Sequence, residues 1–168
     1  QLDYRLVALS EDPDEGALAT VLPEAFAVIG QPTLDADALA RAGQLRCVLN
    51  VEGNFFPNVD YAAAHRQGVA VLGCGPAYAP AVAEYSLGLA LDLCRGISRA
   101  DRRFRAGQEA YAAEGCLDSV LLSRADVAFL GYGLLGRATH RLLEPFRPTI
   151  RVHDPWVPDS VLDAAGLL

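Results

Sequence analysis

Three glycines between residues 131 and 136 have the type and spacing that point most directly to chemistry. The segment reads Gly131-Tyr132-Gly133-Leu134-Leu135-Gly136, a G-x-G-x-x-G pattern. It directly follows the apolar run 126–130 and opens a run with helical periodicity, and Asp154 ends the next apolar run. The pattern alone recurs by chance, but strand, turn, helix, strand and acid in this order are typical of a dinucleotide-binding unit.

Each glycine would have its own role in such a turn. Gly131 would let the chain turn tightly, Gly133 would let a pyrophosphate approach the backbone, and Gly136 would let the helix pack on the strand. The free N–H groups and positive dipole end of the helix would face the phosphates. Asp154 would accept hydrogen bonds from ribose hydroxyls and repel a 2′-phosphate, which favours NAD over NADP. The alternative is a glycine-rich turn that binds no ligand.

Alternating strands and helices must position this turn. Apolar runs bounded by turn residues predict strands at 5–9, 25–29, 45–51, 69–72, 126–130 and 149–152. Helical patterns are predicted from a cap at Thr33 to Ala42, and at 60–67, 80–106, 135–146 and 157–168. The short connections predict parallel sheets covered by helices.

The predicted helix 80–106 is apolar at first and then basic. This pattern suggests a link between two domains, with Arg99, Arg102, Arg103 and Arg105 on a solvated face. The small and polar segment 107–115 that follows is predicted to be a loop.

Composition excludes several classes of function. The 168 residues carry a net charge of -7, and all 14 basic residues are Arg. An acidic chain without a basic stripe is a poor ligand for nucleic acid. No run reaches the roughly 18 apolar residues of a membrane span. Four cysteines without C-x-x-C spacing predict no metal site and fit a reduced, cytoplasmic setting.

Two features suggest that the sequence is a piece of a longer product. It contains no Met. The run 160–168 has the pattern of a helix that stops before its partner strand.

Several segments together resemble the D-isomer-specific 2-hydroxyacid dehydrogenase family, which includes the phosphoglycerate dehydrogenase-like proteins. Residues 45–60 look like the strand and substrate-carboxylate loop of that family, and residues 68–71 like its next strand. Val82-Ala83-Glu84 is similar to the start of its interdomain helix, and residues 131–136 with Asp154-Pro155 match its cofactor fingerprint.

The resemblance implies an α/β fold with two Rossmann-like parallel-sheet domains, the second only partly present. Residues 1–98 would be the N-terminal part of a substrate-binding, flavodoxin-like domain, and residues 99–168 the first half of an NAD-binding Rossmann domain. The implied enzyme is an NAD-dependent oxidoreductase that transfers hydride between nicotinamide and the C2 atom of a 2-hydroxy or 2-oxo acid. The resemblance also implies a homodimer formed mainly by the cofactor domain.

The resemblance assigns site residues by position. The cofactor would contact Gly131, Gly133, Leu134, Leu135, Gly136, Asp154, Pro155 and Tyr78. The substrate would contact Gly53, Asn54 and Tyr78. No catalytic residue is assigned in this chain, because the Arg, the His and the carboxylate that the family uses lie downstream of its second β-α-β unit. His65, His140 and His153 do not occupy that motif and are expected to be surface or capping residues.

Three departures from the family pattern bear on ligand binding. Leu134-Leu135 stands where the family usually carries Arg-Ile, so a direct Arg contact to the pyrophosphate is lost, and Arg137 is a candidate to compensate. Tyr78 stands where a small polar residue is common; it either contacts the substrate pocket or packs on its loop. The loop 52–57 is longer and more aromatic than usual, and Phe55 and Phe56 either line the pocket or belong to core or dimer contacts.

Two functions remain open at this point. The first is the NAD-dependent dehydrogenase. The alternative is a non-catalytic, NAD-sensing regulatory protein on the same scaffold, and an Arg, an acid and a His in the remaining sequence of the parent protein would separate the two. A third interpretation takes the 168 residues as a complete degenerate domain, but a half-built sheet with exposed edges argues against it.

Overall fold

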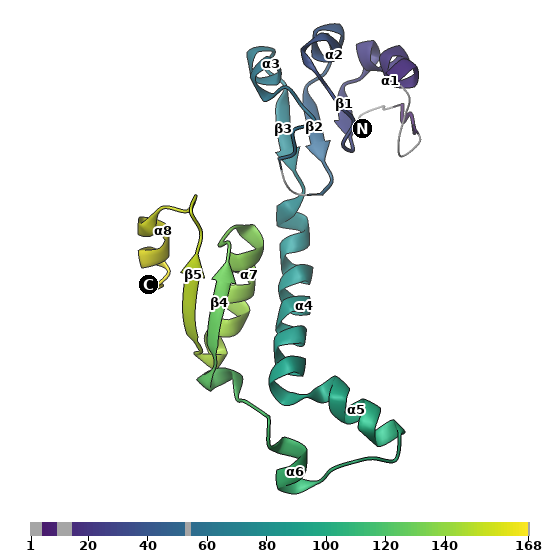
Figure 1. Ribbon diagram of the computed structural model, residues 1–168. Helices are drawn as coiled ribbons and strands as arrows, with labels where there is room; N and C mark the ends of the chain where they lie inside the picture. Colours follow the sequence, from purple (N-terminus) through teal and green to yellow (C-terminus); the bar gives the residue numbers. More distant parts are fainter. Residues whose placement is uncertain (1–4, 10–14, 53–54, 168) are drawn as a thin grey trace. The chain divides into compact units, whose positions relative to one another are not determined.

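The chain is described by a computed structural model that covers residues 5–9, 15–52 and 55–167 (Figure 1). It divides into two compact units, Gln1–Pro76 and Ala77–Leu168. Each unit contains its own parallel sheet. The fold class is therefore α/β with two parallel sheets, as the sequence predicts. The proposed division into substrate and cofactor domains after residue 98 stays a prediction.

The first unit is a three-stranded parallel sheet with short helical crossovers. Its strands are β1 (Ala27–Ile29), β2 (Cys47–Asn50) and β3 (Ala70–Gly73), in the order β1-β2-β3. The helices are α1 (Glu15–Val21), α2 (Ala36–Arg41) and α3 (Tyr61–Arg66), with a short 3-10 turn at Leu22–Glu24. The predicted strands at 25–29, 45–51 and 69–72 and the helix at 60–67 are thus confirmed, with bounds that differ by one or two residues.

Fully buried apolar side chains hold this unit together. Leu22, Leu34, Leu39, Leu45 and Val48 are all at most 1% exposed and belong to one core cluster. Burial of each such side chain contributes about 1.5–3 kcal/mol relative to full exposure. The core therefore fixes β2, whose carboxyl end leads into the turn at residues 51 and 52.

Two predictions fail in the first unit. Residues 5–9 form no regular secondary structure, and Leu6 is 87% exposed. Thr33 does not cap α2, because Leu34 forms a bridge with Val59 and stays outside the helix. Asp35 caps α2 instead, and its carboxylate accepts a hydrogen bond from the Ala38 amide at 2.7 Å.

The second unit begins with helices and then forms a two-stranded sheet (Figure 1). Its helices are α4 (Gly75–Arg95), α5 (Ile97–Arg105), α6 (Ala112–Cys116), α7 (Leu134–Leu143) and α8 (Asp159–Ala164). Two short 3-10 turns occupy Leu122–Arg124 and Glu144–Phe146. The strands β4 (Asp126–Leu130) and β5 (Thr149–His153) pair in parallel, as the runs at 126–130 and 149–152 predict.

The predicted helix at 80–106 is in fact two helices. Gly96 adopts a left-handed conformation with φ +64°, which ends α4, and glycine meets no steric cost there. The Asp92 carboxylate then accepts hydrogen bonds from the amide and hydroxyl of Ser98. These bonds, the amide first, lower the pKa of Asp92. The sequence prediction missed this break because Gly96 lies within an otherwise continuous helical pattern.

A backbone hydrogen bond joins the two ends of the segment between α4 and β4. The Val120 amide donates a hydrogen bond to the Cys94 carbonyl oxygen at 2.8 Å. Between these residues lie α5, whose described side chains are all at least partly exposed, and α6, which replaces part of the loop predicted at 107–115. Arg99 and Asp118 form an exposed ion pair at 3.3 Å across this segment.

The cap of α2 generates a stability prediction. We expect Asp35→Ala to lower the free energy of unfolding by about 1 kcal/mol, because the Ala38 amide loses its acceptor. Thr33→Ala is the matched control, with an expected loss below about 0.5 kcal/mol, as for other surface sites. Urea denaturation of both variants measures the difference. A larger loss at Thr33 than at Asp35 would contradict this assignment.

Candidate dinucleotide-binding site

The glycine turn joins β4 to α7 at the carboxyl end of the two-stranded sheet. Gly131 has φ +92°, which favours glycine, and its amide donates to the His153 carbonyl oxygen at 2.8 Å. A Cβ atom at Gly136 would lie 2.9 Å from the Gly131 carbonyl oxygen. These two glycines are therefore required by the fold of the turn itself.

Gly133 differs from its two neighbours in the motif. Its φ is −74°, and a Cβ atom there would meet no described atom of the protein within 4 Å. The residue is the N-cap of α7, and no described side chain caps this helix. The first N–H groups of an α-helix have no partners within the helix. The open space beside these donors has the character of an anion site.

Asp154 is fixed beside this turn by backbone amides. Its Oδ2 atom accepts a hydrogen bond from the Tyr132 amide at 2.6 Å, and Oδ1 accepts from the amides of Trp156 at 3.0 Å and Val157 at 3.2 Å. These amides, Tyr132 first, hold the pKa of Asp154 below its usual range. The carboxylate is thus ionised at neutral pH, and about one of its roughly four acceptor positions remains for a hydroxyl.

A buried contact lies behind the turn that sequence analysis did not find. The Tyr132 side chain is 2% exposed, and its hydroxyl lies 2.6 Å from Nδ1 of His140 on α7. Burial raises the pKa of Tyr132, so its hydroxyl stays protonated. His140 is half-buried, and the expectation of a surface or capping residue is wrong for it.

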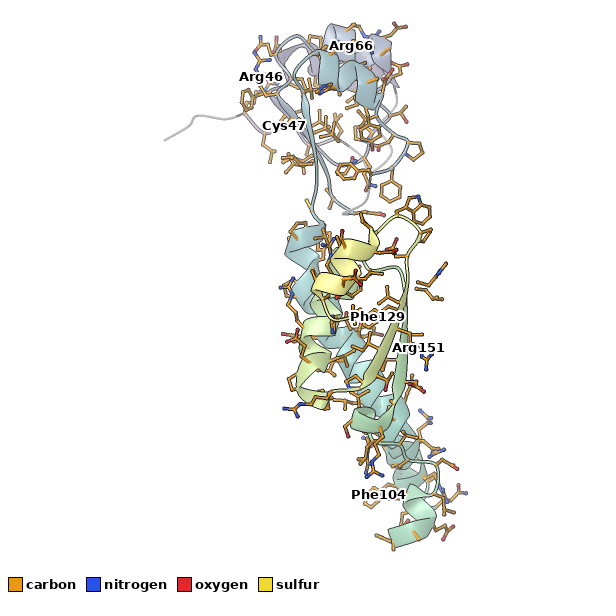
Figure 2. The ribbon with its side chains drawn as sticks, turned by 90° about the vertical axis from the view of Figure 1, so that its left-hand side faces the viewer. Arg46, Cys47, Arg66, Phe104, Phe129 and Arg151 are labelled. Atoms are coloured by element: carbon orange, nitrogen blue, oxygen red, sulfur yellow. The ribbon has the colours of Figure 1, made fainter. Side chains whose placement is uncertain are left out.

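Phe129 completes this aromatic cluster from strand β4. Its ring centroid lies 6.0 Å from that of Tyr132, with an angle of 86° between the planes, and 6.5 Å from the His140 ring. In Figure 2, Phe129 and the Arg151 of the neighbouring strand lie on β4 and β5. Arg151 is exposed and faces Asp126 at 4.0 Å. Side chains alternate between the two faces of a strand, so the aromatic cluster and this ion pair lie on opposite faces of the sheet.

The structure brings together most of the predicted cofactor residues. Leu130 pairs with His153 in the sheet register, which places the turn next to Asp154 and Pro155. Leu134 and Leu135 are 49% and 43% exposed in the first turn of α7. The Arg137 guanidinium donates to the Gly133 carbonyl oxygen at 3.3 Å, so this cation does lie at the turn.

Tyr78 lies in α4, four residues before Val82, and not in a loop. The helix begins at Gly75-Pro76, where proline suits a first helical position, so Val82-Ala83-Glu84 does not open it. The Tyr78 side chain is 38% exposed. Its assignments to the cofactor and the substrate both stay predictions.

The predicted substrate residues Gly53 and Asn54 lie outside the described residues. The strand before them ends at Asn50, which is fully buried. Its side-chain oxygen accepts a hydrogen bond from the side-chain amide of Asn58 at 3.2 Å. The Asn58 amide also donates to the Pro32 carbonyl oxygen at 3.2 Å. Asn58 thus joins the end of β2 to Pro32, a contact that the sequence did not predict. After the loop, the Phe55 ring packs edge-on against Tyr61 at 6.1 Å.

In the described part of the chain, no three His, Cys, Asp or Glu side chains lie close enough to hold a metal ion. No helix among these residues is long and apolar enough to cross a membrane. A cavity of about 350 Å³ is lined by residues of α5, α6 and the loop between them, and none of its lining belongs to the glycine turn.

The fold and the turn define a Rossmann-type dinucleotide-binding protein, and comparisons with known proteins agree. Residues 87–167 match the model of the D-isomer specific 2-hydroxyacid dehydrogenase, NAD binding domain. A 2-hydroxyacid dehydrogenase homolog of Haemophilus influenzae is 37% identical over 112 residues, which are 66% of this chain and 33% of that protein. A D-3-phosphoglycerate dehydrogenase of Mycobacterium leprae is 29% identical over 94% of this chain and 29% of its own length.

A solved structure extends this similarity to nearly the whole chain. The phosphoglycerate oxidoreductase of Rhizobium etli superposes with a TM-score of 0.76 and 40% identity, over 98% of this chain and 51% of that one. The chain therefore belongs to the D-isomer specific 2-hydroxyacid dehydrogenase family. It spans between about a third and a half of the length of these relatives.

The unequal surroundings of the glycines lead to a second prediction. Gly136→Ala should lower the free energy of unfolding by about 1–3 kcal/mol, because its Cβ atom would overpack against backbone. Gly133→Ala should cost less than about 1 kcal/mol, the difference between two N-cap residues. Thermal unfolding of both variants followed by circular dichroism measures this. Equal losses would show that the protein itself crowds position 133.

Proposed function

We propose that this chain supplies the NAD-binding turn and part of the substrate-binding domain of an NAD-dependent 2-hydroxyacid dehydrogenase. The parent enzyme would oxidise the CH–OH group of a 2-hydroxy acid or reduce a 2-oxo acid. The observation that carries the proposal is the ionised Asp154 carboxylate, held by the Tyr132 amide beside the uncapped N-terminus of α7. The helix N-terminus would bind the pyrophosphate of NAD, and the carboxylate would bind its adenosine ribose.

The residues present fit the cofactor. The N–H groups that open α7 would bind the pyrophosphate, and the space beside Gly133 would admit it. Asp154 would accept a hydrogen bond from the adenosine ribose, and Arg137 would add positive charge near the phosphates. NAD would supply a hydride acceptor or donor. What the chain itself does is bind and orient this cofactor.

The substrate would be a small 2-hydroxy or 2-oxo acid. Relatives with such names include the hydroxypyruvate reductase of Thermotoga maritima, 28% identical over 94% of this chain. Backbone N–H groups of Gly53 and Asn54, with Tyr78, remain the proposed contacts for its carboxylate and neighbouring groups. The catalytic Arg, His and carboxylate are expected in the remaining sequence of the parent protein.

We also propose a cytoplasmic homodimer. Large apolar side chains on and after α4 are exposed in the described chain, and a partner subunit would cover them. They include Tyr85, Leu93, Ile97, Phe104, Tyr111 and Leu117, which are 56–82% exposed. The four cysteines are all free, which suits a reducing compartment.

Replacement of Asp154 tests the ribose contact. We expect Asp154→Arg to weaken NAD binding and strengthen NADP binding, because a cation would replace the anion that faces the 2′-position. Both affinities can be measured by isothermal titration calorimetry. Asp163→Arg on α8 makes the same change of charge at an exposed position and should leave the ratio unchanged. Unchanged NAD affinity in Asp154→Arg would remove this residue from the site.

Turnover tests the proposal that the catalytic residues are not among these 168. The 168-residue chain should bind NADH but should not oxidise it in the presence of pyruvate, glyoxylate or hydroxypyruvate. The decrease in the near-ultraviolet absorbance of NADH measures the rate. Sustained oxidation by this chain would show that catalytic groups are already present. Binding without turnover by the complete parent protein would instead favour the regulatory alternative.

A further inference from the structure

We propose that His140 and Tyr132 are positioning residues that fix the Asp154 carboxylate and thereby set the preference for NAD over NADP. The inference rests on the proposed NAD site. It follows from two hydrogen bonds that Tyr132 makes: its hydroxyl bonds to Nδ1 of His140 at 2.6 Å, and its backbone amide donates to Asp154 Oδ2 at 2.6 Å. One residue thus joins the imidazole to the carboxylate.

The position of Tyr132 in the motif explains why its side chain matters. It stands between Gly131 and Gly133, and glycine restricts the backbone least of all residues. The Tyr132 amide must nevertheless point at Asp154 with a defined orientation. The side chain is 2% exposed and is held by the rings of Phe129 and His140. This anchorage gives the Tyr132 amide its fixed orientation between the two glycines.

The anchor connects the turn to the body of helix α7. His140 lies two turns after the helix N-terminus, and its ring centroid is 5.9 Å from that of Tyr132. Loss of the hydroxyl–imidazole bond would leave the turn tied to α7 only through its own backbone, the Arg137 bond to the Gly133 carbonyl oxygen and ring packing. The amide of Tyr132 would then sample other orientations, and Oδ2 of Asp154 would lose its donor for part of the time.

A mobile carboxylate would discriminate less between the two cofactors. The ribose hydroxyls of NAD need an acceptor in a fixed place, and a 2′-phosphate is rejected by a negative charge that cannot move away. Release of Oδ2 therefore weakens NAD binding and relieves the repulsion of NADP. A general loosening of the site would instead lower both affinities by the same factor, because the two cofactors share the pyrophosphate contacts.

The experiment is a titration of the 168-residue chain with NAD and with NADP, for the wild type and for Tyr132→Phe. This variant removes one oxygen atom and keeps the ring. We expect NAD affinity to fall about three- to tenfold, as for loss of one hydrogen bond, and NADP affinity to change less than about twofold. Tyr111→Phe removes an exposed hydroxyl and is the matched control.

Further variants make the test specific. His140→Leu should lower the ratio of NAD affinity to NADP affinity, as Tyr132→Phe does. His140→Gln should keep most of the wild-type ratio, because the glutamine amide can bond to the Tyr132 hydroxyl. In an Asp154→Ala background, Tyr132→Phe should leave the ratio unchanged, since the path then ends on no carboxylate. Circular dichroism spectra show whether each variant is folded.

The possible failures can be told apart. If the wild type prefers NAD and the folded Tyr132→Phe variant keeps the same ratio, or loses both affinities equally, Tyr132 does not act through Asp154 and the inference is wrong. If the wild type binds neither cofactor, the proposed function fails and this inference fails with it. A full effect of Tyr132→Phe in the Asp154→Ala background would also overturn it.

Discussion

The hydrogen bond between the Tyr132 amide and Asp154 is the interaction on which the candidate site depends. It links the first turn after β4 to the first residue after β5, across the carboxyl edge of a parallel pair. The register that pairs Leu130 with His153 makes this contact possible. A shift of that register by one residue would turn the side chains to the opposite face and separate the acid from the glycine turn. The register of the sheet therefore also sets the positions of the groups that would bind the ligand.

The cofactor motif could be predicted from the sequence because its parts are local. Gly131, Gly136 and Asp154 lie in one β-α-β unit, and the structural reason for each glycine depends on neighbours within a few residues. The α/β fold class was predictable for the same reason, since most apolar runs became strands within one or two residues of their expected bounds.

What the sequence could not predict depends on contacts between distant segments. The cap of α2 moved from Thr33 to Asp35 because Leu34 pairs with Val59, a residue that lies beyond the next strand. The pairing of Tyr132 with His140 was missed because the motif accepts any residue at its second position. Only the packing of α7 on β4 shows which ring meets which.

The hydrogen bond between Val120 and Cys94 bears on where relatives of this chain should differ in length. It brings the two ends of the segment with α5 and α6 together, so this segment leaves and rejoins the unit at one point. Such an excursion can gain or lose residues without moving the strands, and each doubling of a flexible loop costs only about 0.6 kcal/mol. Length differences among relatives should therefore concentrate between these residues, where subunit contacts could diverge while the β-α-β unit stays the same.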